Sequence, residues 1–239
     1  GPRYFEGKQK QYSWFLHAEY PLLKDKLILS AGIRYDWWKN YDGKFYDYTT
    51  GKKIAFEYPE STEDYWSPKA GLVYHLTDYT RFRVSYGKGF RAPDLYSLYR
   101  SGPHGPTLFD IGNPELEPEK MIYSIDVGFD TKPFYELFKV AKDFNLSFTA
   151  YWSAFTDFIY RKELKPHEIP SYFTPEPGQE VRQKVNVGKV RINGIEVGID
   201  YTFFRHFKIK ANYTYNVSKI IKNPLAPETE RKLLRYTPK

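Results

Sequence analysis

The stretch 207-FKIKANYTYNV-217 decides the fold class of this chain. Apolar and polar residues alternate in it at every step, so the two kinds of side chain point to opposite sides of an extended backbone. One side carries Phe207, Ile209, Ala211, Tyr213, Tyr215 and Val217, and the other carries Lys208, Lys210, Asn212, Thr214 and Asn216. Strict alternation of this length predicts a β-strand with one apolar and one polar face.

The same alternation recurs along the chain and predicts about eight strands. They cover residues 11–20, 26–37, 65–76, 80–90, 120–130, 144–154, 183–203 and 207–217. Each has about ten residues or more, whereas strands of soluble proteins average about 5–6 and a tilted strand that crosses a bilayer needs about 9–11. The lengths therefore favour membrane-spanning strands over those of a soluble sandwich.

The links between these strands alternate between short and long. Short links lie at 21–25, 77–79 and 204–206, with 131–143 as a longer link on the same side, and long links lie at 38–64, 91–118, 156–182 and from 218 onward. In an up-and-down meander this order gathers every long loop at one rim. Short periplasmic turns and long extracellular loops are typical of outer-membrane barrels.

Composition agrees with such a barrel and argues against several other classes. Aromatic residues make up 19% of the 239 residues and gather near the predicted strand ends, where rings at a bilayer interface would lie. These rings are Tyr20, Tyr35, Trp37, Trp38, Tyr65, Trp66, Tyr151, Trp152, Tyr201 and Phe203. The sequence contains no run of about 18 apolar residues, so it predicts no membrane-spanning helix. It contains no Cys, which excludes disulfides and Cys-ligated metals.

The net charge of +7 is spread over strands and loops, without a basic helix, a zinc motif or an RNA-binding signature. Nucleic acid is therefore not an expected partner. The polar faces of the strands predict a charged inner wall that includes Arg34, Lys69, Arg81, Arg83, Lys208 and Lys210.

Both ends of the sequence favour a larger barrel. It begins with the polar stretch GPRYFEGKQKQ, without a signal peptide, and ends in 235-RYTPK-239, directly after a predicted loop. Eight strands alone enclose an interior just wide enough for side chains, which four long loops would not need. We therefore expect an all-β, antiparallel, up-and-down transmembrane β-barrel with further strands on both sides of these eight.

Five stretches together resemble a known family. They are 31-AGIRYDWW-38, 82-FRVSYGKGFRAPDLYSLY-99, 112-GNPELEPEKMIYSIDVGF-129, 184-KVNVGKVRINGIEVGIDYTF-203 and 211-ANYTY-215. In this order, over nearly the whole chain, they resemble the barrel of TonB-dependent outer-membrane receptors. The resemblance implies a barrel of about 22 strands closed by a plug domain, and residues 1–239 would form part of that barrel, without the plug.

The resemblance also implies partners and cargo. The partners would be the plug domain, the TonB–ExbB–ExbD system, and the lipid and lipopolysaccharide of a Gram-negative outer membrane. The cargo would be a scarce metal complex: a ferric siderophore, haem, zinc or cobalamin, with no intrinsic cofactor. A Gly-rich phosphate loop, a nucleophile elbow and an HExxH motif are all absent, so an enzyme is not expected. The alternatives are a passive porin or adhesin-like barrel and a soluble all-β carbohydrate-binding module.

The link 91–118 carries the candidate ligand-binding residues, together with the next long loop. Turn geometry alone can explain Arg91, Pro93, Asn113 and Glu119. Haem-uptake receptors of the family place a histidine between their FRAP-like and NPNL-like segments, and this resemblance makes His104 a candidate ligand of haem iron or zinc.

The full set of candidate ligand-binding residues is His104, Arg91, Tyr96, Tyr99 and His167, with His104 also the candidate metal ligand. A solvated loop histidine is the alternative for His104, because one His without a partner in view is poor evidence for a metal site. His17, His75 and His206 lie in strands or a short turn and rank lower.

Overall fold

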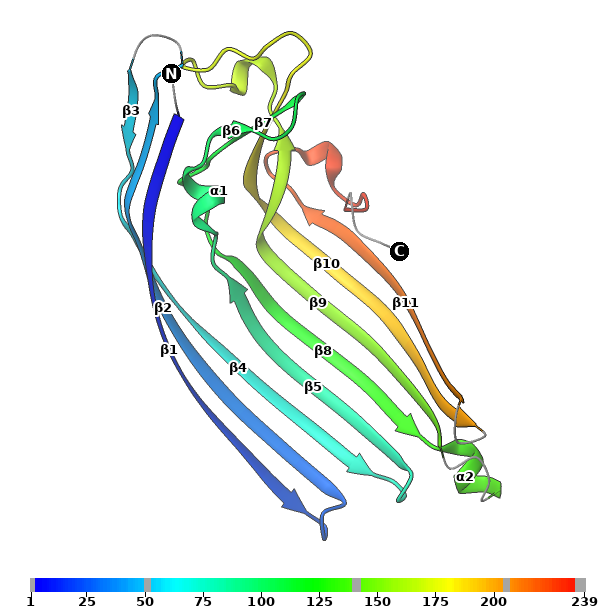
Figure 1. Ribbon diagram of the computed structural model, residues 1–239. Coiled ribbons are helices and arrows are strands. Elements are labelled where there is room, and N and C mark those ends of the chain that lie inside the picture. Colours follow the sequence, from blue (N-terminus) through cyan, green and yellow to red (C-terminus); the bar gives the residue numbers. More distant parts are fainter. Residues whose placement is uncertain (1–2, 50–52, 139–142, 204–206, 235–239) are drawn as a thin grey trace.

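The computed structural model describes residues 3–49, 53–138, 143–203 and 207–234, which form one curved, steeply tilted β-sheet (Figure 1). Its long strands are β1 (Arg3–Leu22), β2 (Leu27–Asp47), β4 (Ser61–His75), β5 (Thr80–Arg91), β8 (Glu119–Thr131), β9 (Phe144–Glu163), β10 (Glu180–Phe203) and β11 (Phe207–Lys222). Short strands are β3 (Ile54–Glu57), β6 (Gly102–Pro103) and β7 (Leu108–Ile111), and the α-helices are α1 (Leu95–Tyr99) and α2 (Pro133–Phe138). Each of the eight predicted strands is present.

The long strands form an antiparallel meander in which each pairs with its neighbours in chain order. β3 pairs with the upper part of β2, and β7 pairs in parallel with the start of β10. The 11-stranded sheet is not closed: β1 and β11 are its outer members along the meander. Among the described residues, no helix is long and apolar enough to cross a membrane.

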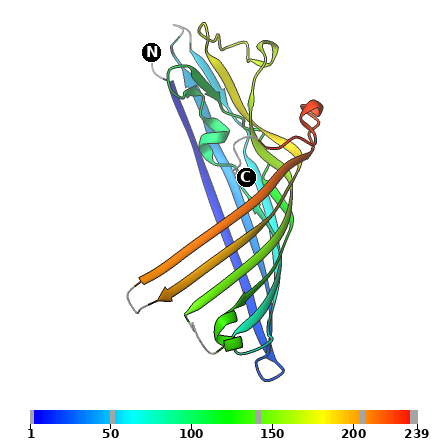
Figure 2. The same ribbon diagram turned by 90° about the vertical axis from the view of Figure 1, so that its right-hand side faces the viewer.

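The strand register places the polar positions on one face. Arg83 pairs with Gly128 and Gly128 with Thr149 across three strands, and Arg83 Nη2 donates to Thr149 Oγ1 over 2.9 Å. The same register places all six predicted wall residues on this inner face, which also carries the segment between β5 and β8 (Figure 2). Phe148 points to the other face, where its ring lies 5.7 Å from that of Phe129.

Three of the rings expected at a bilayer interface lie on the inner face instead. Trp38 is 2% exposed and stacks on Phe90 at 4.7 Å, and Tyr65 lies 5.2 Å from the same ring. Tyr151 lies over Gly194. Aromatic content near a strand end therefore did not decide the face, because register decides which way a ring points. The side chain of Phe203 lies outside the described part of the chain.

The expected loop 38–64 is largely strand, and the expected loop 156–182 begins and ends in strand, which corrects the sequence prediction. β2 continues to Asp47 and β9 to Glu163, well past the apolar alternation. A bulge at Asp42, whose φ is 55°, changes which residues of β2 are buried. Before the bulge they are even-numbered, as at Asn40, and after it they are odd-numbered, as at Phe45 and Asp47. One extra residue reverses the two faces of a strand, so a simple period of two no longer marks this extension.

The two ends of the sheet differ as predicted. The turns after β1 and β4, together with α2, lie at one end, called the turn end below; β3, β6 and β7 lie at the other, the loop end (Figure 1). The expected turn 204–206 and the terminal 235–239 lie outside the described residues. After β11 the chain passes through a 3₁₀ turn at Pro227–Thr229, and Leu233 forms a β-bridge with Lys219.

The arrangement of the two ends predicts opposite labelling in intact cells. In the full-length protein, a cysteine replacing His104 at the loop end should react with an impermeant maleimide, and one replacing Asp78 at the turn end should not. Labelling of the Asp78 variant alone would show that the turn end, and not the loop end, faces the outside of the cell. Permeabilised cells, in which both variants should react, provide the control.

The register also predicts which substitutions the membrane tolerates. Phe148→Arg should cost roughly 2–4 kcal/mol of folding free energy if Phe148 lies near the bilayer midplane, because it puts a charge into lipid. Thr149→Arg, on the inner face beside Arg83, should cost much less. The free energies would come from folding titrations in lipid vesicles. A larger loss of folding free energy for Thr149→Arg than for Phe148→Arg would show that the assignment of the inner and outer faces is reversed.

Candidate ligand-binding site

The segment between β5 and β8, residues 92–118, is called the inner segment here. Pro93 restricts Ala92 to extended geometry and so separates the segment from β5. Asp94 then caps α1: its Oδ1 accepts from Ser97 N at 2.6 Å. Figures 1 and 2 show that α1 lies beside the upper parts of β1 and β2, so the segment extends along the inner face.

Tyr99 anchors the inner segment to the first two strands. Its ring is 3% exposed, stacks on Tyr58 at 5.4 Å and lies over Gly7 of β1 and Gly43 of β2. A Cβ at Gly43 would stand 2.5 Å from the ring, so glycine leaves the room that the ring fills. Burial raises the pKa of Tyr99, and it raises the pKa of Tyr58 to about 12.

The other side of the inner segment is anchored to β10. β7 adds to the β10 edge at residues 180–183, and Phe109 of β7 stacks on Phe173 at 4.0 Å. The Nζ of Lys184 on β10 donates a hydrogen bond to Ser97 Oγ at 2.5 Å. The backbone carbonyl of Lys184 accepts one from Asn113 Nδ2 at 2.9 Å. The segment therefore connects strands near both ends of the meander at the loop end of the sheet.

His104 lies at the exposed tip of this anchored segment. It sits in the turn of the β6–β7 hairpin, where its N–H donates to Leu108 O at 2.8 Å and Gly105 has φ 83°. Its side chain is 53% exposed, and Nδ1 lies 3.5 Å from Asp110 Oδ2. The hairpin is thus anchored by its strands while the imidazole at its tip is accessible to solvent. The structure also shows a neighbouring carboxylate, Asp110, that the sequence did not single out.

The other predicted ligand-binding residues have different surroundings. Arg91 forms an ion pair of 2.8 Å with Glu119, whose Oε2 also accepts from Ile159 N, so this pair joins β5, β8 and β9. Tyr96 is 40% exposed and lies under the Arg100 guanidinium at 4.4 Å. These contacts support the structural interpretation of Arg91 and Glu119 and leave Tyr96 more accessible than the buried Tyr99.

His167 lies exposed in the 3₁₀ turn Pro166–Glu168 of the next long connection. No hydrogen bond or ion pair joins it to His104 within the described residues, and the described residues hold no group of three or more His, Cys, Asp or Glu that could bind a metal ion. A site built from both histidines therefore remains a proposal.

A hollow of about 530 Å³ lies on the inner wall where the inner segment begins. Its lining includes Gln9 and Gln11 of β1, Arg34 and Asp36 of β2, and residues 92–94. Arg34 donates to both oxygens of Asp36, at 2.8 and 2.7 Å, and Asp36 is 1% exposed. Gln9, Gln11 and Asp36 are not among the residues predicted from the sequence, although the alternation of β1 and β2 does mark their positions as inner ones.

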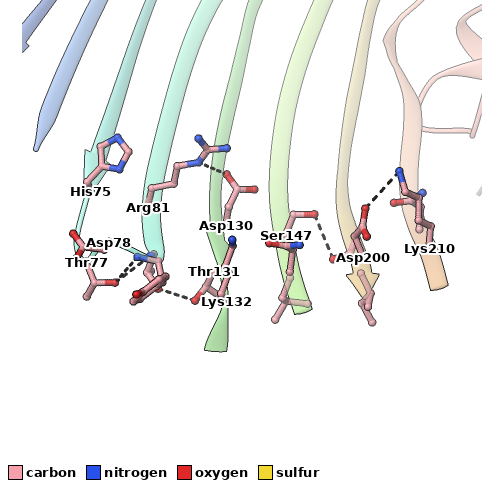
Figure 3. Close-up of a pocket in the computed structure, with 17 residues that line it drawn as sticks. His75, Thr77, Asp78, Arg81, Asp130, Thr131, Lys132, Ser147, Asp200 and Lys210 are labelled. Atoms are coloured by element: carbon pink, nitrogen blue, oxygen red, sulfur yellow. Dashed lines mark hydrogen bonds and ion pairs between the residues drawn. The ribbon is translucent and has the colours of Figure 1, made fainter. Parts of the chain in front are cut away.

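A second hollow of about 530 Å³ lies at the turn end (Figure 3). It crosses six strands, and its charges are paired between them: Arg81 with Asp130 at 2.9 Å, and Lys210 with Asp200 at 3.5 Å. The inner wall is therefore polar at both ends, as expected for the lining of a water-accessible passage.

Comparison with known proteins agrees with this architecture. Over residues 1–239 the sequence matches the family described as TonB dependent receptor-like, beta-barrel. The chain belongs to the TonB-dependent receptor family. This family is one of receptor barrels rather than enzymes, which agrees with the resemblance carried by the FRAP and NPEL segments.

Among curated relatives of this TonB-dependent receptor barrel is "Heme/hemopexin utilization protein C" of Haemophilus influenzae (strain 86-028NP). It is 27% identical over 198 residues, which cover 78% of this chain and 25% of the relative. A second match, in strain KW20 / Rd, has 26% identity over 204 residues, 78% of this chain and 26% of the relative. The chain thus spans about a quarter of the length of these relatives.

Solved structures share the fold. The "Copper transporter OprC" superposes with a TM-score of 0.66 at 20% identity, over 95% of this chain and 31% of that one. The Serratia marcescens hemophore receptor HasR, solved with its hemophore HasA and haem, also superposes with a TM-score of 0.66 at 20% identity. The match covers 89% of this chain and 34% of that one. At this identity the likeness shows the TonB-dependent receptor fold alone.

The contact between Tyr99 and Gly43 predicts that Gly43→Ala releases the inner segment. The added Cβ overlaps the ring, and overpacking of this kind typically costs about 1–3 kcal/mol. Hydrogen exchange of residues 95–116 should then be faster than in wild type. Gly89→Ala is the matched control, because its Cβ would meet only Met121 Cε, at 3.4 Å; equal exchange in both variants would remove the anchoring role of Tyr99.

Proposed function

We propose that the full-length protein captures haem, or a complex that carries haem, at the outer surface of a Gram-negative cell and imports it with energy from TonB. The observation that carries this proposal is the position of His104 on an exposed hairpin tip at the loop end, on a segment anchored at its base. Imidazole is a common ligand of haem iron. An accessible imidazole at the mouth of a receptor barrel suits the capture of such a cargo.

The names of the relatives support haem as the cargo class. Three curated relatives are all called "Heme/hemopexin utilization protein C", and one structural neighbour was solved with haem and a hemophore. A ferric siderophore, zinc and cobalamin are the other cargoes that the sequence left open. Each is a distinct outcome of the binding experiment below.

The proposed mechanism is binding without chemistry. The inner segment and the adjoining long connections would hold the cargo at the loop end, with Tyr96 and His167 as further candidate contacts. Movement of the plug domain, driven by the TonB–ExbB–ExbD system, would then open the route along the polar inner wall. The paired charges of Arg81 with Asp130 and of Lys210 with Asp200 keep that wall hydrated without a large excess of one sign.

The outer face of the sheet supports the proposed placement in the outer membrane. Tyr12, Trp14 and Leu16 of β1 are 65%, 49% and 67% exposed and belong to the apolar alternation of that strand. Apolar side chains in such a row suit contact with lipid and, near the cell surface, lipopolysaccharide. Membership of a receptor family favours an energised receptor over a passive porin, and the apolar outer face disfavours a soluble carbohydrate-binding module.

The proposed role of His104 predicts a loss of affinity in His104→Ala. Haem affinity of the full-length receptor in detergent should fall at least tenfold, about 1.4 kcal/mol, and the absorption bands of a histidine-ligated haem should disappear. Barrel stability should stay at the wild-type value, because His104 lies outside the long strands. Titration of each variant with haem, and separately with zinc, provides the measurement.

His167→Ala serves as the companion variant. It should weaken haem binding only if the 156–182 connection closes onto the same cargo, and its own folding should remain normal. Unchanged affinity of His104→Ala for both haem and zinc would reject both cargoes and leave a ferric siderophore or another organic metal complex.

A further inference from the structure

Asp110 is a buried carboxylate beside the exposed His104. It lies on β7, its residue is 9% exposed, and its Oδ2 is buried without a hydrogen-bond partner among the described residues. The nearest cationic or ionisable nitrogens are His104 Nδ1, at 3.5 Å, and Arg161 Nη2, at 3.8 Å. A buried carboxylate oxygen without a donor is costly, so this atom is placed to accept a proton donor that approaches it.

The hairpin backbone brings the two residues close together. Gly102 pairs with Asp110, and Pro103 pairs with Phe109, so His104 follows directly at the turn. Asp110 itself pairs with Arg182 of β10 through the parallel ladder. The carboxylate therefore belongs to a paired strand of the sheet, while the imidazole belongs to the turn and lies 3.5 Å away.

We propose that Asp110 is the positioning residue of His104: it accepts the Nδ1 proton and so leaves the Nε2 lone pair directed at the iron of the bound haem. This inference rests on the proposed function. A carboxylate only accepts, so the ring nitrogen that faces it must carry the hydrogen, and in neutral imidazole the other nitrogen is then the free ligand atom. Carboxylates in this position orient a ligating histidine and raise its basicity.

Arg161 provides the competing explanation for Asp110. Its guanidinium, on β9, approaches the same oxygen, and an Asp110–Arg161 pair could serve only to fasten β7 to the wall. Arg182, the register partner of Asp110, directs its guanidinium to Glu180, at 2.5 and 2.9 Å. The two roles of Asp110 differ in one respect: only positioning acts on the electronic state of the bound iron.

The test uses Asp110→Asn in the full-length receptor, beside His104→Ala. Asparagine preserves the shape but removes the charge. We expect haem affinity to fall by about 10–100-fold, the bands of histidine-ligated haem to persist, and the midpoint potential of the bound haem to rise, because a less basic imidazole stabilises ferric iron less. Asp110→Glu should restore part of the affinity and of the potential.

Two further variants separate positioning from fastening. Glu115→Gln, an exposed carboxylate of the same segment, should behave as wild type. Arg161→Gln should loosen the hairpin in limited proteolysis without raising the potential. If Arg161→Gln and Asp110→Asn lose affinity equally and neither shifts the potential, Asp110 is a fastening residue and the inference is wrong.

The outcome also distinguishes this inference from the proposed function. Wild-type affinity and potential in Asp110→Asn, with haem binding lost in His104→Ala, would overturn the role of Asp110 and leave haem capture by His104 standing. Unchanged haem affinity in His104→Ala would overturn both.

Discussion

The pairing of backbone N–H and C=O groups between neighbouring strands is the interaction on which the rest of this structure depends. In a bilayer core no water is present to satisfy those groups, so each strand must pair along its length with the next one. The meander from β1 to β11 does this, and between its bulges the register assigns alternate side chains to the outer face and to the inner wall. The face of each side chain and the pairing of charges across the inner wall both follow from that single constraint.

The loop end obeys a different rule, because side-chain packing is what positions the inner segment there. Tyr99 fills the space over two glycines of β1 and β2, and β7 continues the hydrogen bonding of β10 beyond the end of β11. These contacts join strands that are distant in the meander. They also leave the β6–β7 turn exposed at the tip of a segment that is anchored on both sides, as the proposed capture of a cargo would require.

Two kinds of information, of unequal weight, bear on the function of this protein. Family membership covers the whole chain and settles the class of protein, whereas the relatives' names and the position of His104 point to haem only as a proposal. Asp110 adds a structural observation to the position of His104: a buried carboxylate oxygen without a hydrogen-bond partner among the described residues, next to an exposed imidazole. Its value is that it links the cargo question to a measurable property of the bound iron.

The sequence by itself determined the fold class, the eight long strands and the two faces of residues such as Phe148 and Thr149, because a period of two is a local property of an extended chain. It also marked the inner segment, through Pro93 and Asn113, and His104 through the resemblance. Only the tertiary structure decided that Trp38 and Tyr65 face inward and that strands extend through most of 38–64 and into both ends of 156–182. It also decided that Tyr99 is buried over Gly43 and that Asp110 lies beside His104. Those outcomes depend on a bulge, on register and on contacts between residues distant in sequence, and no local pattern records them.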